Sequence, residues 1–363
     1  MKVKKLISFL FSTALIAGIG FAIYLNQDFC KIQINKVKGM YYVHKGDIAY
    51  KELKMNKAIK MYNQGVRLFP GHYGAWYNLG NIYVAYEDYP SALYAYSQAF
   101  KHNPRLMIAR MNYGIIATEK LGNFDIAIEQ FDKIIKTKRH LLTIPYVYDN
   151  KVSSKVNKAI AYYNKGVAYR MKSLYSDDNW EKQRKYLGKA INSYKKSIKI
   201  DPNRYDTWYN LGIAYHISGN FNDAGISYCR AIELEPMNFE AHYNLAVLLR
   251  RLRHYQESYD EIEKASTLVT ALDTNSNAQE YVAMMMNDIT KNLYQNPEYK
   301  NYLKSIVDKE KVKIKKHSPN KDKEIKENKV NLINGKIAVS DENDKAILRS
   351  FGICPSIHFF TFE

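Results

Sequence analysis

Residues 76–80 read Trp-Tyr-Asn-Leu-Gly, and the same five residues recur at 208–212. The unit that each copy opens is about 34 residues long, and self-similarity at such a period is the mark of a repeat architecture. The chain is therefore predicted to be an array of similar units. Both copies are followed at equal distances by a tyrosine, an alanine and a proline, which are Tyr83, Ala92 and Pro104 after the first copy and Tyr215, Ala224 and Pro236 after the second.

This spacing of Trp, Leu-Gly, Tyr, Ala and Pro resembles the tetratricopeptide repeat, a unit of two helices joined by a turn. Phasing the chain on the two complete copies gives six units, three over residues 39–141 and three over residues 159–272. The fourth unit closes about twelve residues late, so the stretch around Lys172 to Lys185 is expected to lengthen the turn between its helices. The resemblance implies an all-α fold, a helix-turn-helix solenoid of about six repeats.

The small residues and prolines of the repeat have a packing reason. Glycine at the eighth position of a unit and alanine at the twentieth are expected where its two helices cross closely, because no larger side chain fits there. A proline near the end cannot continue a helix and marks the start of the next unit. Capping helices are predicted over residues 273–315, since apolar residues fall on one face of a helix that begins at Ser276. That face consists of Ala278, Val282, Met285, Met286, Ile289 and Leu293.

Two stretches match no repeat. Residues 142–158 are either a linker between the two groups of three units or an extended first helix of the fourth unit, and spacing does not separate the two. Residues 316–363 begin Lys-rich and end apolar, and this composition predicts a flexible tail. Within the tail, Asn334-Gly335 is the signal of a small hairpin.

A run without charge extends from Leu6 to Leu25, directly after three lysines. About 20 apolar residues in a helix span a hydrocarbon core of ~30 Å. Residues 1–30 are therefore predicted to form a cytoplasmic tip and a single transmembrane signal-anchor. A short N-terminal tail usually stays in the cytoplasm, which places the repeats on the extracytoplasmic side. The alternative is a signal peptide cleaved near Gly20-Phe21-Ala22, which would leave a secreted protein.

The charge balance and the motifs narrow the function class. The net charge is +18, but most repeats carry both signs, so the lysines indicate a solvated surface more than a nucleic-acid site. A nucleic-acid-associated helical repeat protein is kept as an alternative. The chain has no GxGxxG, Walker, GxSxG or HExxH motif, and its three cysteines form no CxxC pair. We expect no catalysis, no cofactor and no metal.

In the family that the repeats resemble, the first helix of each unit lines an inner groove. Units two to six carry asparagine at the sixth position, and four units carry tyrosine at the fifth. An asparagine side chain has one acceptor and two donors, so a row of them can pair with both N–H and C=O of an extended peptide. The plainer alternative is that asparagine is common in this repeat and solvates the groove wall. The predicted groove residues are Asn78, Asn112, Asn164, Asn210, Asn244, Tyr77, Tyr163, Tyr209, Tyr243, His216 and Arg250.

The sequence therefore predicts a membrane-anchored, non-catalytic scaffold that binds an extended segment of a protein partner. A regulatory or assembly subunit of an envelope enzyme or secretion complex is the second hypothesis. Chaperone-binding members of the family clamp a C-terminal carboxylate with Lys, Asn and Arg at set positions. Only the central asparagine of that clamp is matched here, by Asn78 or Asn210, so a carboxylate clamp is not expected.

Overall fold

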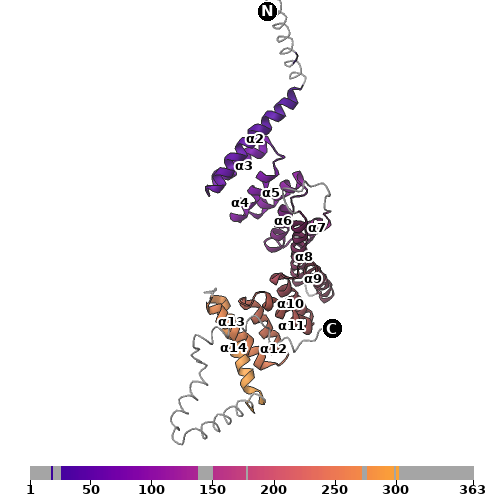
Figure 1. The fold of residues 1–363 in the computed structure, drawn as a ribbon, viewed down its shortest axis with the longest axis vertical. Helices are drawn as coiled ribbons and strands as arrows, with labels where there is room; N and C mark the ends of the chain where they lie inside the picture. The colour runs from indigo at the N-terminus through magenta and orange to yellow at the C-terminus, as the bar shows by residue number, and fades with distance from the viewer. Residues whose placement is uncertain are drawn as a thin grey trace, which may run out of the picture. The chain divides into compact units, whose positions relative to one another are not determined.

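The chain is all-helical in the part that the computed structural model describes, which comprises residues 26–137, 150–176, 179–271 and 276–297 and the single positions 18, 300 and 301 (Figure 1). Thirteen helices and no strands occur in that part, which confirms the predicted fold class. The helices are α2 (Gln27–Lys51), α3 (Met55–Leu68), α4 (Tyr73–Ala85), α5 (Tyr89–His102), α6 (Met107–Glu119), α7 (Phe124–Lys136), α8 (Asn150–Leu174), α9 (Trp180–Ile200), α10 (Tyr205–Ser218), α11 (Phe221–Leu234), α12 (Phe239–Arg251), α13 (Tyr255–Ala271) and α14 (Ser276–Gln295).

Consecutive helices pack as pairs, and each pair is one repeat unit. The chain divides into two compact parts, Met1–Lys151 and Val152–Glu363. We call the described helices α2 to α7 the first block and α8 to α14 the second block. Each block holds three helix pairs, and α14 packs against α13 at the end of the second.

Three of the units are tied by a hydrogen bond to the proline that closes the unit before them. The indole N–H of Trp76 donates to the carbonyl oxygen of Pro70 at 2.8 Å, and Trp208 donates to Pro202 at the same distance. In the sixth unit His242 occupies the position that holds Trp in the second and fifth units, and its Nε2 lies 3.0 Å from the carbonyl oxygen of the proline six residues before it. The repeated Trp and Pro are thus the two ends of one recurring hydrogen bond.

The glycine at the eighth position of a unit lies against an aromatic ring of the second helix. A methyl group at Gly80 would come within 2.5 Å of the Tyr96 ring, and one at Gly212 within 2.6 Å of the Tyr228 ring. Such distances leave no space for any side chain, so the helices of a pair approach as the repeat pattern predicts. The same contact recurs at Gly46 with Tyr62, at Gly114 with Phe131 and at Gly166 with Tyr194.

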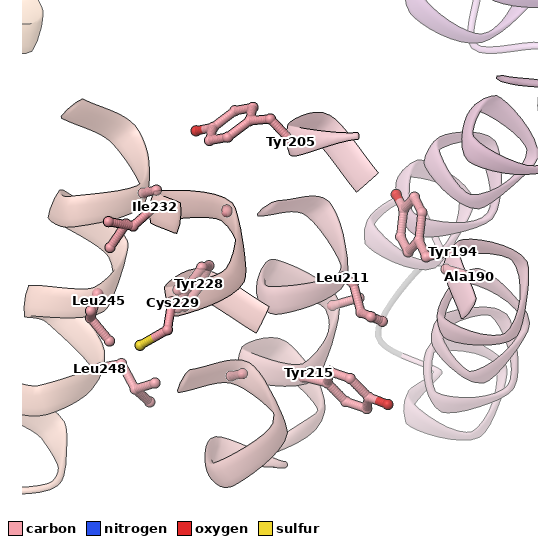
Figure 2. Close-up of a cluster of buried hydrophobic side chains, with 14 of the residues drawn as sticks. Ala190, Tyr194, Tyr205, Leu211, Tyr215, Tyr228, Cys229, Ile232, Leu245 and Leu248 are labelled. Atoms are coloured by element: carbon pink, nitrogen blue, oxygen red, sulfur yellow. The ribbon is translucent and has the colours of Figure 1, made fainter. Parts of the chain in front are cut away.

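The core of the second block runs from one unit into the next (Figure 2). Leu211 of α10, Tyr228 and Ile232 of α11, and Leu245 and Leu248 of α12 are all buried in one cluster. No single helix pair encloses these side chains, so neighbouring units stabilise one another.

The last helix, α14, covers the end of the second block. Val282 and Ile289 are buried in a cluster with Ala246 of α12 and Ile262 of α13. A terminal unit of a repeat array exposes an apolar face unless another element covers it. This helix therefore removes from water the surface on which a seventh repeat would pack.

One expectation about the fourth unit is wrong. Its additional residues do not lengthen the turn, because α8 has 25 residues, α9 has 21, and only five residues, 175–179, separate them. No proline interrupts either stretch, so both helices continue. Helix α8 begins at Asn150, which assigns residues 150–158 to an extended first helix, and residues 138–149 lie outside the described part.

Several predicted segments cannot be compared with the structure. The apolar run at residues 6–25, apart from position 18, lies outside the described residues, and so do the tail at 316–363 and its hairpin. Among the helices that are described, none combines the length and apolar character needed to cross a bilayer.

A buried ion pair joins α12 to α13. His242 Nδ1 lies 2.6 Å from Glu261 Oε2, and Lys264 Nζ lies 3.0 Å from Glu261 Oε1. Both ring nitrogens of His242 face oxygen atoms, so the ring joins the Glu261 carboxylate to the carbonyl oxygen of Pro236. Burial raises the pKa of Glu261, but the hydrogen bond from His242 and the charges of His242 and Lys264 outweigh burial and bring that pKa below its usual 4.5.

We predict that Gly212→Ala lowers the free energy of unfolding by about 1–3 kcal/mol, because the new methyl group displaces the Tyr228 ring. The matched control is Gly188→Ala in α9, where a methyl group would meet nothing within 4 Å. That change should stabilise the chain by up to about 1 kcal/mol, through better helix propensity. Urea unfolding followed by circular dichroism measures both, and equal effects would contradict the close contact.

We also predict that Glu261→Gln destabilises the protein by about 3 kcal/mol at pH 6, because it removes the buried carboxylate that pairs with His242 and Lys264. The folded pKa of Glu261 is lowered, so its ionisation stabilises the fold above about pH 4.5 and this contribution is lost as the pH falls further. Urea unfolding between pH 3 and pH 6 should therefore show the difference from wild type shrinking in acid. Glu280→Gln on the exposed side of α14 serves as the control, and a difference independent of pH would contradict the assignment.

Candidate functional site

The predicted asparagines and tyrosines all lie on first helices of their units. We call the side chains at the fifth and sixth positions the first-helix face of each block. In the first block it comprises Tyr77 and Asn78 of α4 and Asn112 of α6. In the second block it comprises Tyr163 and Asn164 of α8, Tyr209 and Asn210 of α10, and Tyr243 and Asn244 of α12.

In the first block each asparagine bonds to a buried tyrosine of the preceding unit. Asn78 Nδ2 donates to the Tyr62 hydroxyl at 3.1 Å and to Asp47 Oδ1 at 3.4 Å. The Tyr62 hydroxyl in turn donates to Asp47 Oδ1 at 2.7 Å. One unit later the same chain of bonds runs from Asn112 to the Tyr96 hydroxyl at 3.4 Å and on to Asn81 Oδ1 at 2.7 Å.

In the second block the asparagines bond to a different tyrosine. Asn210 Nδ2 donates to the Tyr163 hydroxyl at 3.4 Å, and Asn244 Nδ2 donates to the Tyr209 hydroxyl at 2.8 Å. These tyrosines belong to the first helix of the preceding unit rather than to its second helix. Both asparagines also donate to the backbone carbonyl one turn earlier, at 2.9 and 3.1 Å. Asn164 makes the corresponding backbone bond to Ile160 at 3.0 Å.

The ninth position of the unit accounts for this difference. In the first block it holds Asp47 and Asn81, which accept the buried phenol proton. In the second block it holds Val167 and Ile213, which cannot accept a hydrogen bond. The Tyr194 hydroxyl is accordingly buried without a hydrogen-bond partner. These ninth-position residues were not among the predicted site residues. The change from polar to apolar at this one repeat position is visible in the sequence and indicates a difference between the two blocks.

The amide nitrogens of these asparagines donate hydrogen bonds to acceptors within the protein. Asn78, Asn210 and Asn244 each direct both N–H groups to acceptors of their own chain. Within the described residues, no group donates to their Oδ1 atoms or to that of Asn112. A carbonyl oxygen has two lone pairs, so the first-helix face offers fixed acceptors. The face is therefore suited to N–H donors of a ligand, rather than to both N–H and C=O.

The tyrosines of the first-helix face are held by rings beneath them. The ring centroids of Tyr77 and Tyr96 are 5.9 Å apart and those of Tyr209 and Tyr228 are 6.3 Å apart, both in tilted contact. Tyr163 and Tyr194 repeat the pair at 6.1 Å. Burial raises the pKa of Tyr96 to about 12, so this buried phenol is neutral at physiological pH. The tyrosines of the face form fixed, partly exposed aromatic surfaces.

Two of the predicted site residues are engaged in the fold. Arg250 forms an ion pair with Asp288 of α14. The His216 ring makes edge contacts with Phe221 at 5.9 Å and Tyr228 at 6.4 Å. Burial and the Arg251 charge lower the pKa of His216, so it is uncharged at neutral pH. Neither residue presents an unpaired positive charge on the first-helix face.

Comparison with protein families identifies the repeats. Tetratricopeptide repeat family models match residues 73–106 and residues 205–238, and a further TPR repeat model matches residues 181–219. In the described part of the chain, no group of three or more His, Cys, Asp or Glu side chains has the arrangement of a metal site.

Two curated relatives share part of the sequence. A UDP-N-acetylglucosamine–peptide N-acetylglucosaminyltransferase of Giardia intestinalis is 38% identical over 86 residues, which cover 24% of this chain and 6% of that protein. Protein O-mannosyl-transferase TMTC3 of Mus musculus is 26% identical over 184 residues, which cover 51% of this chain and 18% of that protein. The chain thus matches only a small part of each relative.

Among solved structures, PilW, described as a widely conserved type IV pilus biogenesis factor, is 15% identical, with a TM-score of 0.48 over 68% of this chain and 98% of that one. The pilF protein of Pseudomonas aeruginosa is 13% identical, with a TM-score of 0.48 over 69% and 98%. YrrB, described as a TPR protein with an unusual peptide-binding site, is 18% identical, with a TM-score of 0.41 over 55% and 88%. The chain therefore contains tetratricopeptide repeats at residues 73–106 and 205–238, and its other described helices recur in the same pairwise pattern.

Proposed function

We propose that this protein is a non-catalytic, membrane-tethered scaffold whose first-helix faces bind an extended segment of a partner protein. The observation that carries the proposal is the fixed orientation of the asparagines. Their N–H groups are bonded internally, and their Oδ1 atoms are left without a donor among the described residues.

An extended peptide is a suitable partner for such acceptors. Its backbone presents N–H groups at regular intervals whatever its side chains are, and main-chain bonds of this kind supply affinity in strand-like recognition. Each hydrogen bond contributes about 0.5–1.5 kcal/mol net. Because the acceptors are already fixed, little side-chain entropy is lost when the peptide binds.

The tyrosines add an apolar component to this surface. Tyr77, Tyr163 and Tyr209 are held against buried rings and keep one face partly exposed. Tyrosine gives large contact area at low entropic cost and is enriched at protein interfaces. Side chains of the peptide would pack on these rings between the backbone contacts.

The tether rests on the uncharged run at residues 6–25, which has the length of a membrane span. In this proposal the partner segment is held close to a membrane, with the repeats on the extracytoplasmic side. A role as regulatory or assembly subunit of an envelope complex is compatible with the same binding mode.

The binding mode is testable with peptides. Dodecapeptides selected from a random phage library on the immobilised full-length chain are resynthesised with single N-methyl groups, and their affinity is measured by fluorescence polarisation. Removing an N–H that meets an asparagine should weaken binding about 3- to 10-fold, as expected for one hydrogen bond. Tolerance of N-methylation at every position, or no selected binder, would contradict the proposal.

A complementary test keeps the selected peptide unchanged and mutates Asn210 and Asn244 of the protein. Replacing both with Ala should reduce affinity at least 10-fold while circular dichroism stays unchanged. The matched control replaces Tyr163 and Tyr209 with Phe, because it removes the hydroxyls to which these asparagines donate and keeps both Oδ1 acceptors and both rings. Equal losses in the two double variants would exclude acceptance of peptide N–H groups as the cause.

The tether is tested separately. Membranes from cells that express the full chain are extracted with alkaline carbonate, and the mass of the protein is determined. An uncleaved chain retained in the pellet is the expected result, because a membrane span resists this extraction. A soluble chain that begins after residue 22 would show that the signal peptide alternative is correct.

A further inference from the structure

Cys229 of α11 occupies a repeat position that is polar in the other units. It directly follows Tyr228, whose ring packs on Gly212. Cys229 is 0% exposed and belongs to the core cluster of the second block (Figure 2). The equivalent residues of the other units are all partly or fully exposed, and they are Asn63, Ser97, Asp132, Lys195 and Glu263. The burial of Cys229 therefore requires a covering segment that the other units lack.

One helical turn earlier, α11 has less side-chain bulk than its counterparts. Gly225 stands four residues before Cys229, so the two share one face of the helix. At the Gly225 position the other units carry large apolar residues, which are Ile59, Leu93, Ile128, Ile191 and Tyr259. Gly225 is nevertheless buried, and α11 has seven buried residues where α5, which has the same length and is also followed by another unit, has four. A face with less bulk and more burial indicates that an additional segment packs on it.

The thiol of Cys229 is also not free. Cys229 is disulfide-bonded, whereas Cys30 near the start of α2 is a free cysteine. The chain has three cysteines, so Cys354 is the one remaining partner within the chain. Cys354 lies outside the described residues, in a stretch of apolar sequence that contains Phe351, Ile353, Ile357, Phe359 and Phe360. The bonded state of Cys229 and the need for an apolar cover thus point to the same segment.

We propose that a disulfide between Cys229 and Cys354 holds residues 351–360 on the face of α11 that contains Gly225. This site is separate from the proposed peptide-binding faces, because α11 is the second helix of its unit. Docking removes the apolar side chains of the segment from water, which favours the contact in addition to the covalent bond. The loop that the bond closes contains the whole sixth unit and α14, so the bond also stabilises that end of the array by restricting the unfolded chain.

Formation of the bond is a two-electron oxidation, and the oxidant is the disulfide of a thiol oxidoreductase. The Cys354 thiolate attacks that disulfide and forms a mixed disulfide with the oxidoreductase. The Cys229 thiolate then attacks the Cys354 sulfur, which forms the new bond and releases the oxidoreductase as a dithiol. Both electrons and two protons leave with that dithiol. Such bonds persist in oxidising compartments, in agreement with the proposed extracytoplasmic location of the repeats.

Non-reducing peptide mapping tests the bond in the wild-type protein. The full-length chain is extracted from its native cells in N-ethylmaleimide, which blocks free thiols, and is digested with trypsin without reductant. The expected product links residues 205–230 to residues 350–363, and dithiothreitol should separate the two peptides. Cys30→Ser is the matched control and should leave this product unchanged. Recovery of both peptides with N-ethylmaleimide on their cysteines, or of Cys229 linked to any other cysteine, would overturn the proposal.

A redox titration distinguishes docking of the segment from the bond alone. The purified full-length chain is equilibrated with mixtures of reduced and oxidised glutathione, in buffer and in concentrated urea, and the linked product is quantified by mass spectrometry. A docked segment keeps the two sulfurs close together, so half-oxidation of the native chain should require a ratio [GSH]²/[GSSG] about 10-fold or more above that in urea. Equal midpoints in the two conditions would show that α11 does not hold the segment.

The face of α11 is tested by Gly225→Leu, which introduces the residue that the second unit carries at this position. The leucine occupies the volume assigned to the docked segment, so the native midpoint should fall about 10-fold toward the value in urea. The control is Gly188→Leu on α9, where a methyl group would meet nothing within 4 Å, and it should leave the midpoint within about twofold. Circular dichroism checks the fold of both variants. An unchanged midpoint in folded Gly225→Leu would overturn docking on this face, and the wild-type titration stands whether or not that variant folds.

Discussion

The contact between a glycine of the first helix and an aromatic ring of the second helix is the constraint on which the rest of the structure depends. Five of the six units have it, and in each a methyl group on the glycine would lie 2.5 or 2.6 Å from the nearest ring atom. The ring can lie this close to the helix backbone only because glycine has no Cβ. In the units where the ring is tyrosine, the contact also decides where the hydroxyl goes. Tyr96 packs on Gly80 and still reaches both Asn81 and Asn112.

Each block therefore has the same glycine–ring contacts in its own core, but the two blocks differ at their first-helix faces. In the first block, polar residues at the ninth position take up the buried phenol protons, and Asp47 adds a carboxylate. In the second block, Val167 and Ile213 leave the buried phenols without that acceptor, and the asparagines bond to the outer tyrosines instead. One repeat position thus changes which hydroxyls are available to a ligand without changing how the helices pack.

The sequence predicts the helix pairs well because their determinants lie within one unit. Glycine and alanine permit the close crossing of two neighbouring helices, and proline ends a helix. The 34-residue spacing of these residues is visible in the sequence without any structure. The lengths of α8 and α9 were not predicted, because additional residues at a turn can extend either the loop or the helices. The directions of the asparagine bonds were not predicted either, since they join residues 16 to 47 positions apart. The pairing of His242 with Glu261 had one signal, a histidine at the position where two other units carry Trp.

A row of equivalent acceptors cannot by itself determine which residue of a peptide lies where. Moving an extended chain by two residues presents the same backbone groups to the same asparagines, because the strand repeats with that period. A single charged contact removes this ambiguity, since only one residue of the peptide can meet it.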